Sequence, residues 1–221
     1  MALFNFSKNF KKRIFTSIGL IFLLLLMLIN NFILGYFLII IGIIAILEFC
    51  KINLIISKKN KFNQYFFNLL FIIYIFAFCT FFFILSSYLH LKILIFLILF
   101  ICVASDIGGY VFGKIFKGAR LTKISPNKTI SGAIGSLFFS LVFASLLFFY
   151  LTKNFDFYII IIGLFTSVSC QLGDLFFSFL KRKSFLKDTG NFLPGHGGIL
   201  DRIDGLLLGV PVGFFVLLFI Y

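Results

Sequence analysis

Seven long hydrophobic runs constrain this chain more than any other feature of its sequence. They lie at about residues 14–30, 32–49, 65–87, 91–113, 130–152, 157–180 and 204–221. A helix needs ~20 mainly apolar residues to cross the hydrocarbon core of a membrane, and each run approaches or exceeds that length. The 221 residues are 62% hydrophobic and only 12% charged. The fold class predicted is therefore all-α, a polytopic integral membrane protein with about seven transmembrane helices.

The runs leave no room for a separate soluble domain, so residues 1–221 are predicted to form a single membrane domain. Residues 1–100 supply N-terminal spans, and residues 101–221 form a C-terminal half. The first run follows basic residues, as in a secretory signal, but residues 27–31 offer no small-residue cleavage site, which favours a retained span. The run at 65–87 has a second interpretation, as two short or re-entrant pieces.

The positions of the basic residues predict how the spans are oriented. With a cytoplasmic N-terminus, alternate loops place 18 of the 20 Lys and Arg residues on the cytoplasmic side, leaving only Lys92 and Lys153 outside. Cytoplasmic loops of membrane proteins carry such an excess of basic residues. The net charge of +13 is thus explained by topology, and no nucleic-acid partner is expected, because there is no basic stripe interleaved with aromatic residues on a soluble surface.

Acidic residues are few and unevenly placed. Of seven, Glu48 and Asp156 lie apart, and five fall in or beside the loops 114–129 and 181–203: Asp106, Asp174, Asp188, Asp201 and Asp204. Asp106 and Asp174 lie inside hydrophobic runs, where a carboxylate costs at least ~2.5 kcal/mol on insertion scales and usually has a function. The alternative is that these two residues pair with Lys or Arg and simply hold helices together.

Asp201 and Asp204 are three residues apart, so on a helix they would share one face, with their Cβ atoms roughly 5–6 Å apart. Two carboxylates at that distance repel each other unless a cation lies between them. Mg²⁺ typically takes one or two carboxylates and leaves its other positions to water and substrate phosphates. The alternative is that both acids complement the positive end of a helix dipole.

Two polar loops could bind phosphate. The stretch at residues 194–198, PGHGG, could bring backbone N–H groups close to an anion, next to the N-terminus of the following helix. The loop GKIFKGARLTKISPNKTISG, residues 113–132, supplies hydroxyls and a cation, although it is not a P-loop and could be only a solvated basic loop. Metal-binding carboxylates, cations and a membrane location together favour phosphoryl or nucleotidyl transfer to a lipid.

The segment SFLKRKSFLKDTGNFLPGHGGILDRID, residues 178–204, resembles the signature of the phosphatidate cytidylyltransferase family. The matching positions are Ser178, Lys181, Arg182, Lys187, Asp188, Gly190, Pro194, His196, Gly197, Gly198, Asp201, Arg202 and Asp204. SDIGGYVFGK and SPNKT resemble two further family segments, so the resemblance covers about residues 105–211. The sequence departs from the family at Ser131, where an acid is usual, and at Gly205, where a Ser is usual.

This resemblance implies transfer of CMP from CTP to phosphatidic acid, which gives CDP-diacylglycerol and pyrophosphate, with Mg²⁺ as cofactor. It implies a catalytic C-terminal half, 101–221, at the cytoplasmic face of a bacterial-type inner (plasma) membrane. The metal ligands would be Asp174 and Asp201. The catalytic group would be Asp174, Lys187, Asp188, His196, Asp201, Arg202 and Asp204. Substrates would contact Asp106, Ser125, Lys128, Thr129, Ser178, Lys181, Arg182, Gly197 and Gly198.

Two other functions are open at this point. One is a CTP-dependent lipid kinase, which would transfer the terminal phosphoryl group to a lipid alcohol. The other is a transporter that relays ions through intramembrane acids, although no internal duplication of the kind common in transporters is found. The sequence is also compatible with a second, monovalent cation and with a homodimer.

Overall fold

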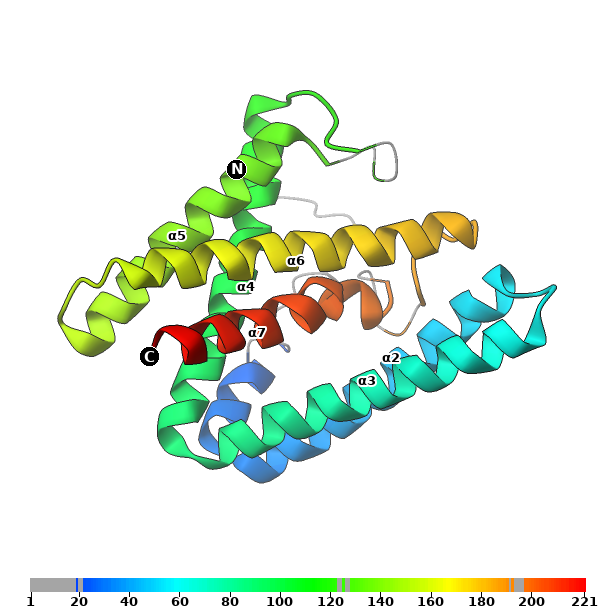
Figure 1. Cartoon of the computed structure of the whole chain (residues 1–221), viewed down its shortest axis with the longest axis horizontal. Helices are drawn as coiled ribbons and strands as arrows, with labels where there is room; N and C mark the ends of the chain where they lie inside the picture. Colours follow the sequence, from blue (N-terminus) through cyan, green and yellow to red (C-terminus); the bar gives the residue numbers. More distant parts are fainter. Residues whose placement is uncertain (1–18, 20–21, 123–124, 126–127, 191, 193–196) are drawn as a thin grey trace, which may run out of the picture. The chain divides into compact units, whose positions relative to one another are not determined.

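The computed structural model describes residues 19, 22–122, 125, 128–190, 192 and 197–221. Within these residues the chain is helical and contains no β-strand (Figure 1). The elements are α2 (Asn31–Ile56), α3 (Lys61–Ser87), α4 (Leu89–Phe116), α5 (Ile130–Thr152), α6 (Tyr158–Lys183) and α7 (Leu200–Ile220). All six are long and apolar enough to cross a membrane. The prediction of an all-α, polytopic integral membrane protein is confirmed.

Each of the last six hydrophobic runs corresponds to one helix. α3 is continuous over 27 residues, so the interpretation of its run as two short pieces is wrong. Of the first run, 14–30, residues 14–18, 20 and 21 lie outside the described residues, and residues 22–29 are helical. A seventh span and a cytoplasmic N-terminus therefore stay predictions.

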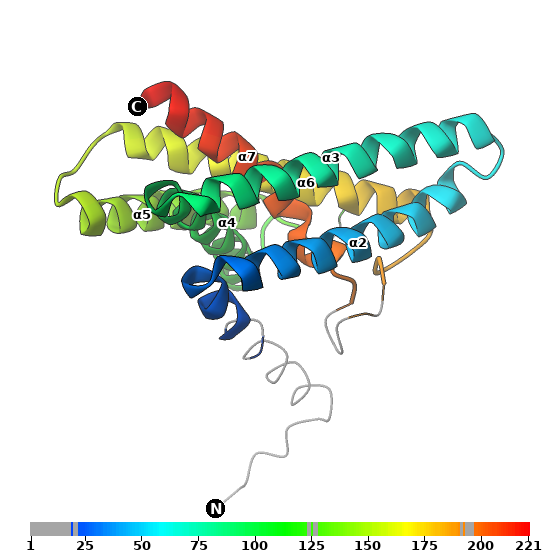
Figure 2. The same ribbon diagram turned by 90° about the horizontal axis from the view of Figure 1, so that it is seen from below.

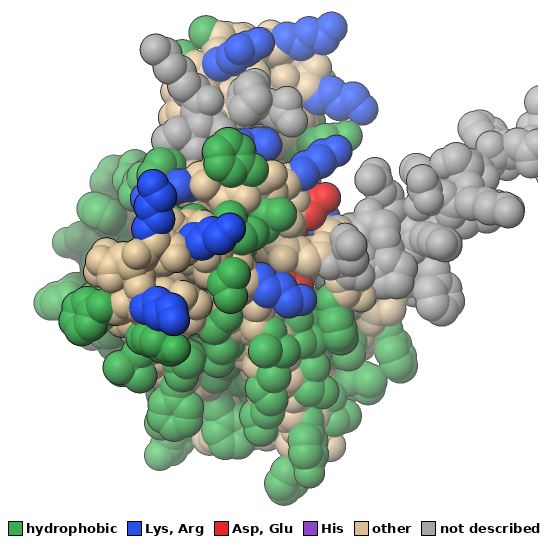
Figure 3. All heavy atoms as spheres, turned by 90° about the vertical axis from the view of Figure 1, so that its right-hand side faces the viewer, with side chains coloured by type: hydrophobic (Ala, Val, Ile, Leu, Met, Phe, Trp, Pro, Cys, Tyr) green, Lys and Arg blue, Asp and Glu red, His purple; other side chains and the backbone are tan. Residues whose placement is uncertain are grey.

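The helices extend beyond the hydrophobic runs that predict them. α2 continues to Ile56 and α7 begins at Leu200, so Asp201 lies on the same helix as Asp204. Many exposed side chains of the helices are large and hydrophobic, and green side chains cover much of the face drawn in Figure 3. Such surfaces suit contact with lipid, whereas the polar helix ends find hydrogen-bonding partners within the protein.

The chain divides into two compact units. The first consists of Met1–Ile84 and Lys183–Arg202. Its main feature is the antiparallel pair of α2 and α3, which Figure 2 shows joined by a short turn. The rings of Phe49 and Phe71 stack with their centroids 3.9 Å apart. Near the turn, the Asn53 side-chain amide donates to the Asn68 side-chain oxygen (2.7 Å), so the pair is tied by packing and by a polar contact.

The second unit consists of Leu85–Arg182 and Ile203–Tyr221 and contains most of α4 to α7. Its helices approach closely at small residues, as is common in membranes. A Cβ atom on Gly108 of α4 would lie 2.4 Å from the Gly135 carbonyl oxygen of α5. A Cβ atom on Gly173 of α6 would lie 2.6 Å from the Asp204 carbonyl oxygen of α7. The crossing at Gly173 places its neighbour Asp174 beside the first turns of α7.

Candidate active site

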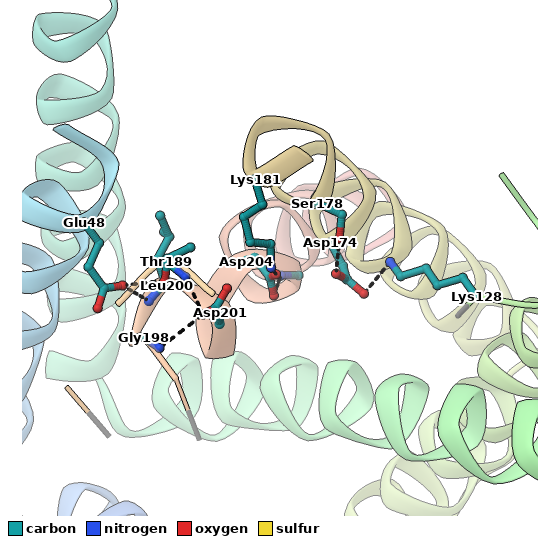
Figure 4. A network of polar contacts seen from close by, with 11 residues as sticks. Glu48, Lys128, Asp174, Ser178, Lys181, Thr189, Gly198, Leu200, Asp201 and Asp204 are labelled. Carbon is teal, nitrogen blue, oxygen red and sulfur yellow. Dashed lines mark hydrogen bonds and ion pairs between the residues drawn. The ribbon is translucent and has the colours of Figure 1, made fainter. Parts of the chain in front are cut away.

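Glu48 is the centre of a polar network in the first unit, which we call the signature-loop network (Figure 4). The residue is only 4% exposed. The Oε2 atom accepts hydrogen bonds from the Thr189 hydroxyl (2.8 Å) and the Leu200 N–H (2.8 Å), and Oε1 accepts from the Ile199 N–H (3.1 Å). The first N–H groups of a helix have no partner within it and carry its positive dipole end. A carboxylate from α2 therefore caps α7.

Glycines of the signature loop, residues 184–199, are needed for this approach. A Cβ atom on Gly190 would lie 2.4 Å from Glu48 Oε1. A Cβ atom on Gly198 would lie 2.0 Å from Thr189 Oγ1 and 2.5 Å from Glu48 Oε2. The sequence predicts that residues 194–198 bring backbone N–H groups close to an anion, and in the structure the Gly198 N–H binds a carboxylate of the protein itself, that of Asp201.

Asp201 lies in the first turn of α7 and also organises the loop. Its Oδ2 atom accepts hydrogen bonds from the backbone N–H groups of Thr189 (2.9 Å) and Gly198 (3.1 Å). Gly197 has a φ of +83°, a conformation that favours glycine, and a Cβ atom there would lie 3.1 Å from Asp201 Oδ2 and 3.5 Å from Asp188 Cβ. Asp188 and Asp201 thus flank Gly197.

The second unit contains a separate group of charges, which we call the acidic cluster: Asp106 of α4, Asp174 of α6 and Asp204 of α7, with Lys128 and Lys181. Lys128 forms an ion pair with Asp174 (Figure 4). Lys181 Nζ lies 3.8 Å from Asp204 Oδ2. The Asp204 carboxylate is within electrostatic range of both Asp174 and Asp106. Each of the two lysines thus lies beside one carboxylate of the acidic cluster.

α6 presents three members of the predicted site on one face. Asp174, Ser178 and Lys181 follow one another at helical spacings of four and three residues, and the Ser178 hydroxyl donates to Asp174 Oδ1 (3.3 Å). Asp106 joins from α4, where its Oδ1 accepts from the Cys170 thiol (3.6 Å). The ion pair of Asp174 with Lys128 is compatible with a functional role for Asp174. It is equally compatible with the alternative, in which the pair simply holds helices together.

The loop before α5 folds back on itself and carries Lys128 to Asp174. The Leu121 N–H donates to the Lys128 carbonyl (2.8 Å), and Arg120 and Thr129 form an antiparallel bridge. Thr129 caps α5, because its hydroxyl oxygen accepts from the Gly132 N–H (3.1 Å). The capping contact gives Thr129 a structural role beside the predicted nucleotide contact. The carbonyl of Ser125 accepts from the Lys128 N–H (3.1 Å).

The structure thus distributes the predicted site residues over two units. The first unit holds Lys187, Asp188, Gly197, Gly198, Asp201 and Arg202, and the second holds Asp106, Ser125, Lys128, Thr129, Asp174, Ser178, Lys181, Arg182 and Asp204. Pro194 and His196 lie outside the described residues. The metal ligands Asp174 and Asp201 belong to different units, so their pairing stays a prediction.

Within the described ranges, no group of three or more His, Cys, Asp or Glu side chains is close enough to hold a metal ion. Zinc and calcium sites usually need such a group. Magnesium differs, because one or two carboxylates with water and substrate phosphates are sufficient. The Asp174 side chain is 34% exposed, and its oxygens are the hard ligands that Mg²⁺ prefers. The residues present therefore fit Mg²⁺.

Glu48 is the site residue that the sequence did not reveal. The sequence does contain a sign of its importance, because Glu48 is a charged residue within a hydrophobic run, just as Asp106 and Asp174 are. It is far in sequence from both polar loops, so no neighbouring motif points to it. The cost of burying a carboxylate applies equally to all three positions.

Comparison with known proteins agrees with the signature. A model of the cytidylyltransferase family matches residues 1–220. A protein named phosphatidate cytidylyltransferase from Rickettsia bellii (strain RML369-C) is 40% identical over 130 residues, which are 54% of this chain and 56% of that protein. Proteins of the same name are 44% identical over 127 residues in Bacillus subtilis (strain 168) and 42% over 126 residues in Staphylococcus aureus (strain COL).

The Bacillus alignment covers 54% of this chain and 46% of the relative, and the Staphylococcus alignment covers 56% and 47%. The chain thus spans about half the length of the curated relatives it matches. The family model, in contrast, extends over both the N-terminal spans and the signature. On this evidence the chain belongs to the cytidylyltransferase family.

Proposed function

We propose that this protein transfers CMP from CTP to phosphatidic acid within a membrane, giving CDP-diacylglycerol and pyrophosphate. The observation that carries the proposal is the contact of Lys128 with Asp174. It joins the SPNKT segment to the span that leads into the signature, two regions that the sequence separately relates to this chemistry. The name phosphatidate cytidylyltransferase on several relatives supports the same reaction.

In this reaction an oxygen of the lipid phosphate attacks the α-phosphorus of CTP. The bond from that phosphorus to the oxygen bridging to the β-phosphate breaks, and pyrophosphate leaves with the electron pair. Positioning and charge neutralisation provide most of the catalysis in such transfers. Lys128 and Lys181 suit this role, because their side chains are 24% and 14% exposed and lie beside carboxylates that fix their position.

Asp174 and Asp201 are the carboxylates proposed to ligate Mg²⁺. The ion would neutralise negative charge on the phosphate oxygens as the bond to the leaving group breaks. Asp201 is already oriented by the N–H groups of Thr189 and Gly198, which limits the number of positions its side chain can adopt. Asp188 and Asp204 would lie next to these ligands and add negative charge there.

The proposal is tested by the choice of acceptor. Purified protein should release pyrophosphate only when CTP and phosphatidic acid are both present. A CTP-dependent lipid kinase would instead use diacylglycerol and release CDP. Release of CDP with diacylglycerol, and no pyrophosphate with phosphatidic acid, would replace the proposed function with the kinase.

The excess of basic residues in alternate loops supports a site that faces the cytoplasm. Asp156 and His90 then lie on the opposite side. Asp156 has a structural contact there, since a hydrogen bond from the Tyr221 hydroxyl and one from the Tyr158 N–H hold the pKa of its carboxyl below the ordinary value. Binding of nucleic acid is not expected, and a homodimer stays a prediction.

Asp156→Asn and His90→Ala are therefore expected to leave turnover within about twofold of wild type, because surface changes away from a site rarely exceed ±0.5 kcal/mol. Steady-state rates at saturating CTP and phosphatidic acid measure this. A tenfold loss in either variant would show that the orientation is inverted or that the site reaches the other face.

A further inference from the structure

We propose that Glu48 is a positioning residue for the reaction: its carboxylate holds the signature loop and the first turn of α7, and so sets the position of the Asp201 carboxylate. The inference rests on the proposed function for its effect on turnover. The hydrogen bonds by which Glu48 fixes the loop do not depend on which reaction the protein catalyses.

The contacts of Glu48 are directed at the loop and the helix that carries the signature. All three described donors to its carboxylate, the Thr189 hydroxyl and the N–H groups of Ile199 and Leu200, belong to residues 189–200. They are more than 140 positions away in sequence. A buried carboxylate that receives three such bonds fixes the groups that donate them.

Glu48 and Asp201 both lie against Thr189 and Gly198. Thr189 donates its hydroxyl to Glu48 and its backbone N–H to Asp201. Gly198 donates its N–H to Asp201, while the space around its Cα is closed by the Glu48 carboxylate. If Glu48 releases the loop, both donors that orient Asp201 Oδ2 can move.

The charge of Glu48 matters as well as its shape. A carboxylate offers two acceptor oxygens, and both oxygens accept hydrogen bonds here. Glutamine has nearly the same shape, but its NH₂ group would face an N–H or O–H donor. Glu48→Gln should therefore break at least one of these contacts without leaving a cavity.

The experiment compares four variants of the full-length protein. Glu48→Gln removes the charge, Thr189→Val removes only the hydroxyl, and Thr189→Ser keeps that hydroxyl. Asn53→Ala is the matched control, because Asn53 is also a buried polar residue of α2, yet its amide donates to Gln64 and Asn68 of α3 rather than to the loop.

The kcat for CMP transfer should fall about 10- to 100-fold in Glu48→Gln, the range typical of residues that orient metal ligands. It should fall about tenfold in Thr189→Val, which loses one hydrogen bond to a charged group, and recover most of that loss in Thr189→Ser. The KM for phosphatidic acid should change less than kcat. Asn53→Ala should keep the wild-type kcat.

Hydrogen exchange provides a readout that does not depend on turnover. Amide exchange at Thr189, Gly198, Ile199 and Leu200 should speed up at least ~10-fold in Glu48→Gln and Thr189→Val, but not in Asn53→Ala. Wild-type kcat and exchange in Glu48→Gln would overturn the inference. So would a Thr189→Ser variant as slow as Thr189→Val. If wild type shows no CMP transfer, the proposed function fails, and the exchange rates alone decide whether Glu48 holds the loop.

Discussion

Asp201→Asn is expected to abolish turnover in a protein that still folds and inserts into the membrane. Asparagine keeps one side-chain oxygen, which can accept the hydrogen bonds from Thr189 and Gly198 that Asp201 Oδ2 accepts now. The local structure should therefore survive. The negative charge that attracts Mg²⁺ is lost and the metal is held more weakly, so kcat should fall at least ~1000-fold, equivalent to roughly 4 kcal/mol of transition-state stabilisation.

The measurement is the rate of CMP transfer by purified variant and wild type, together with their thermal unfolding in the same detergent. Asp156→Asn is the matched control, because it makes the same chemical change at the carboxylate next to Tyr221. Its rate should stay near that of wild type. An Asp201→Asn variant with more than a tenth of the wild-type rate would contradict the assignment of Asp201 to the metal.

A comparable loss is expected from Asp174→Asn, and a double variant separates its two interpretations. The sequence allows Asp174 to be either a metal ligand or the partner in a helix-stabilising ion pair, and its contact with Lys128 fits both. A buried or half-buried charge left without its partner is costly. Lys128→Met and Asp174→Asn should each reduce the rate, by at least ~1000-fold for Asp174→Asn.

The double variant Lys128→Met with Asp174→Asn removes both charges and so leaves neither one unpaired. If the pair only holds α6 and the loop before α5 together, activity should recover in the double variant relative to either single variant. If Asp174 acts on the metal and Lys128 on phosphate, the double variant should remain as inactive as Asp174→Asn. Recovery to near the wild-type rate would contradict the proposed roles of both residues.

The spans could be predicted from sequence because burial in lipid demands long apolar segments, and few other structures use them. The polar helix ends were less predictable. α7 begins at Leu200, four residues before the hydrophobic run 204–221, and the carboxylate of Glu48 satisfies N–H groups at its start. Hydropathy along the chain cannot reveal a cap supplied from another helix.

The candidate site, too, could be predicted from the sequence only in part. Lys181 and Asp204 both belong to the signature, and they lie near each other. The contact between Lys128 and Asp174 joins segments 46 positions apart, which no local pattern encodes. Gly190 and Gly198 match the signature, but the close approach of Glu48 to both positions comes from a distant part of the sequence and could not be predicted.

The most direct test of the proposed reaction follows two labels in one experiment. Purified protein is supplied with phosphatidic acid in vesicles and with CTP labelled in both the cytosine and the terminal phosphate. We predict that the cytosine label enters the lipid fraction while the terminal phosphate appears in free pyrophosphate, and that EDTA stops both. Terminal phosphate in the lipid, or no cytosine label there at any Mg²⁺ concentration, would contradict the proposed cytidylyl transfer.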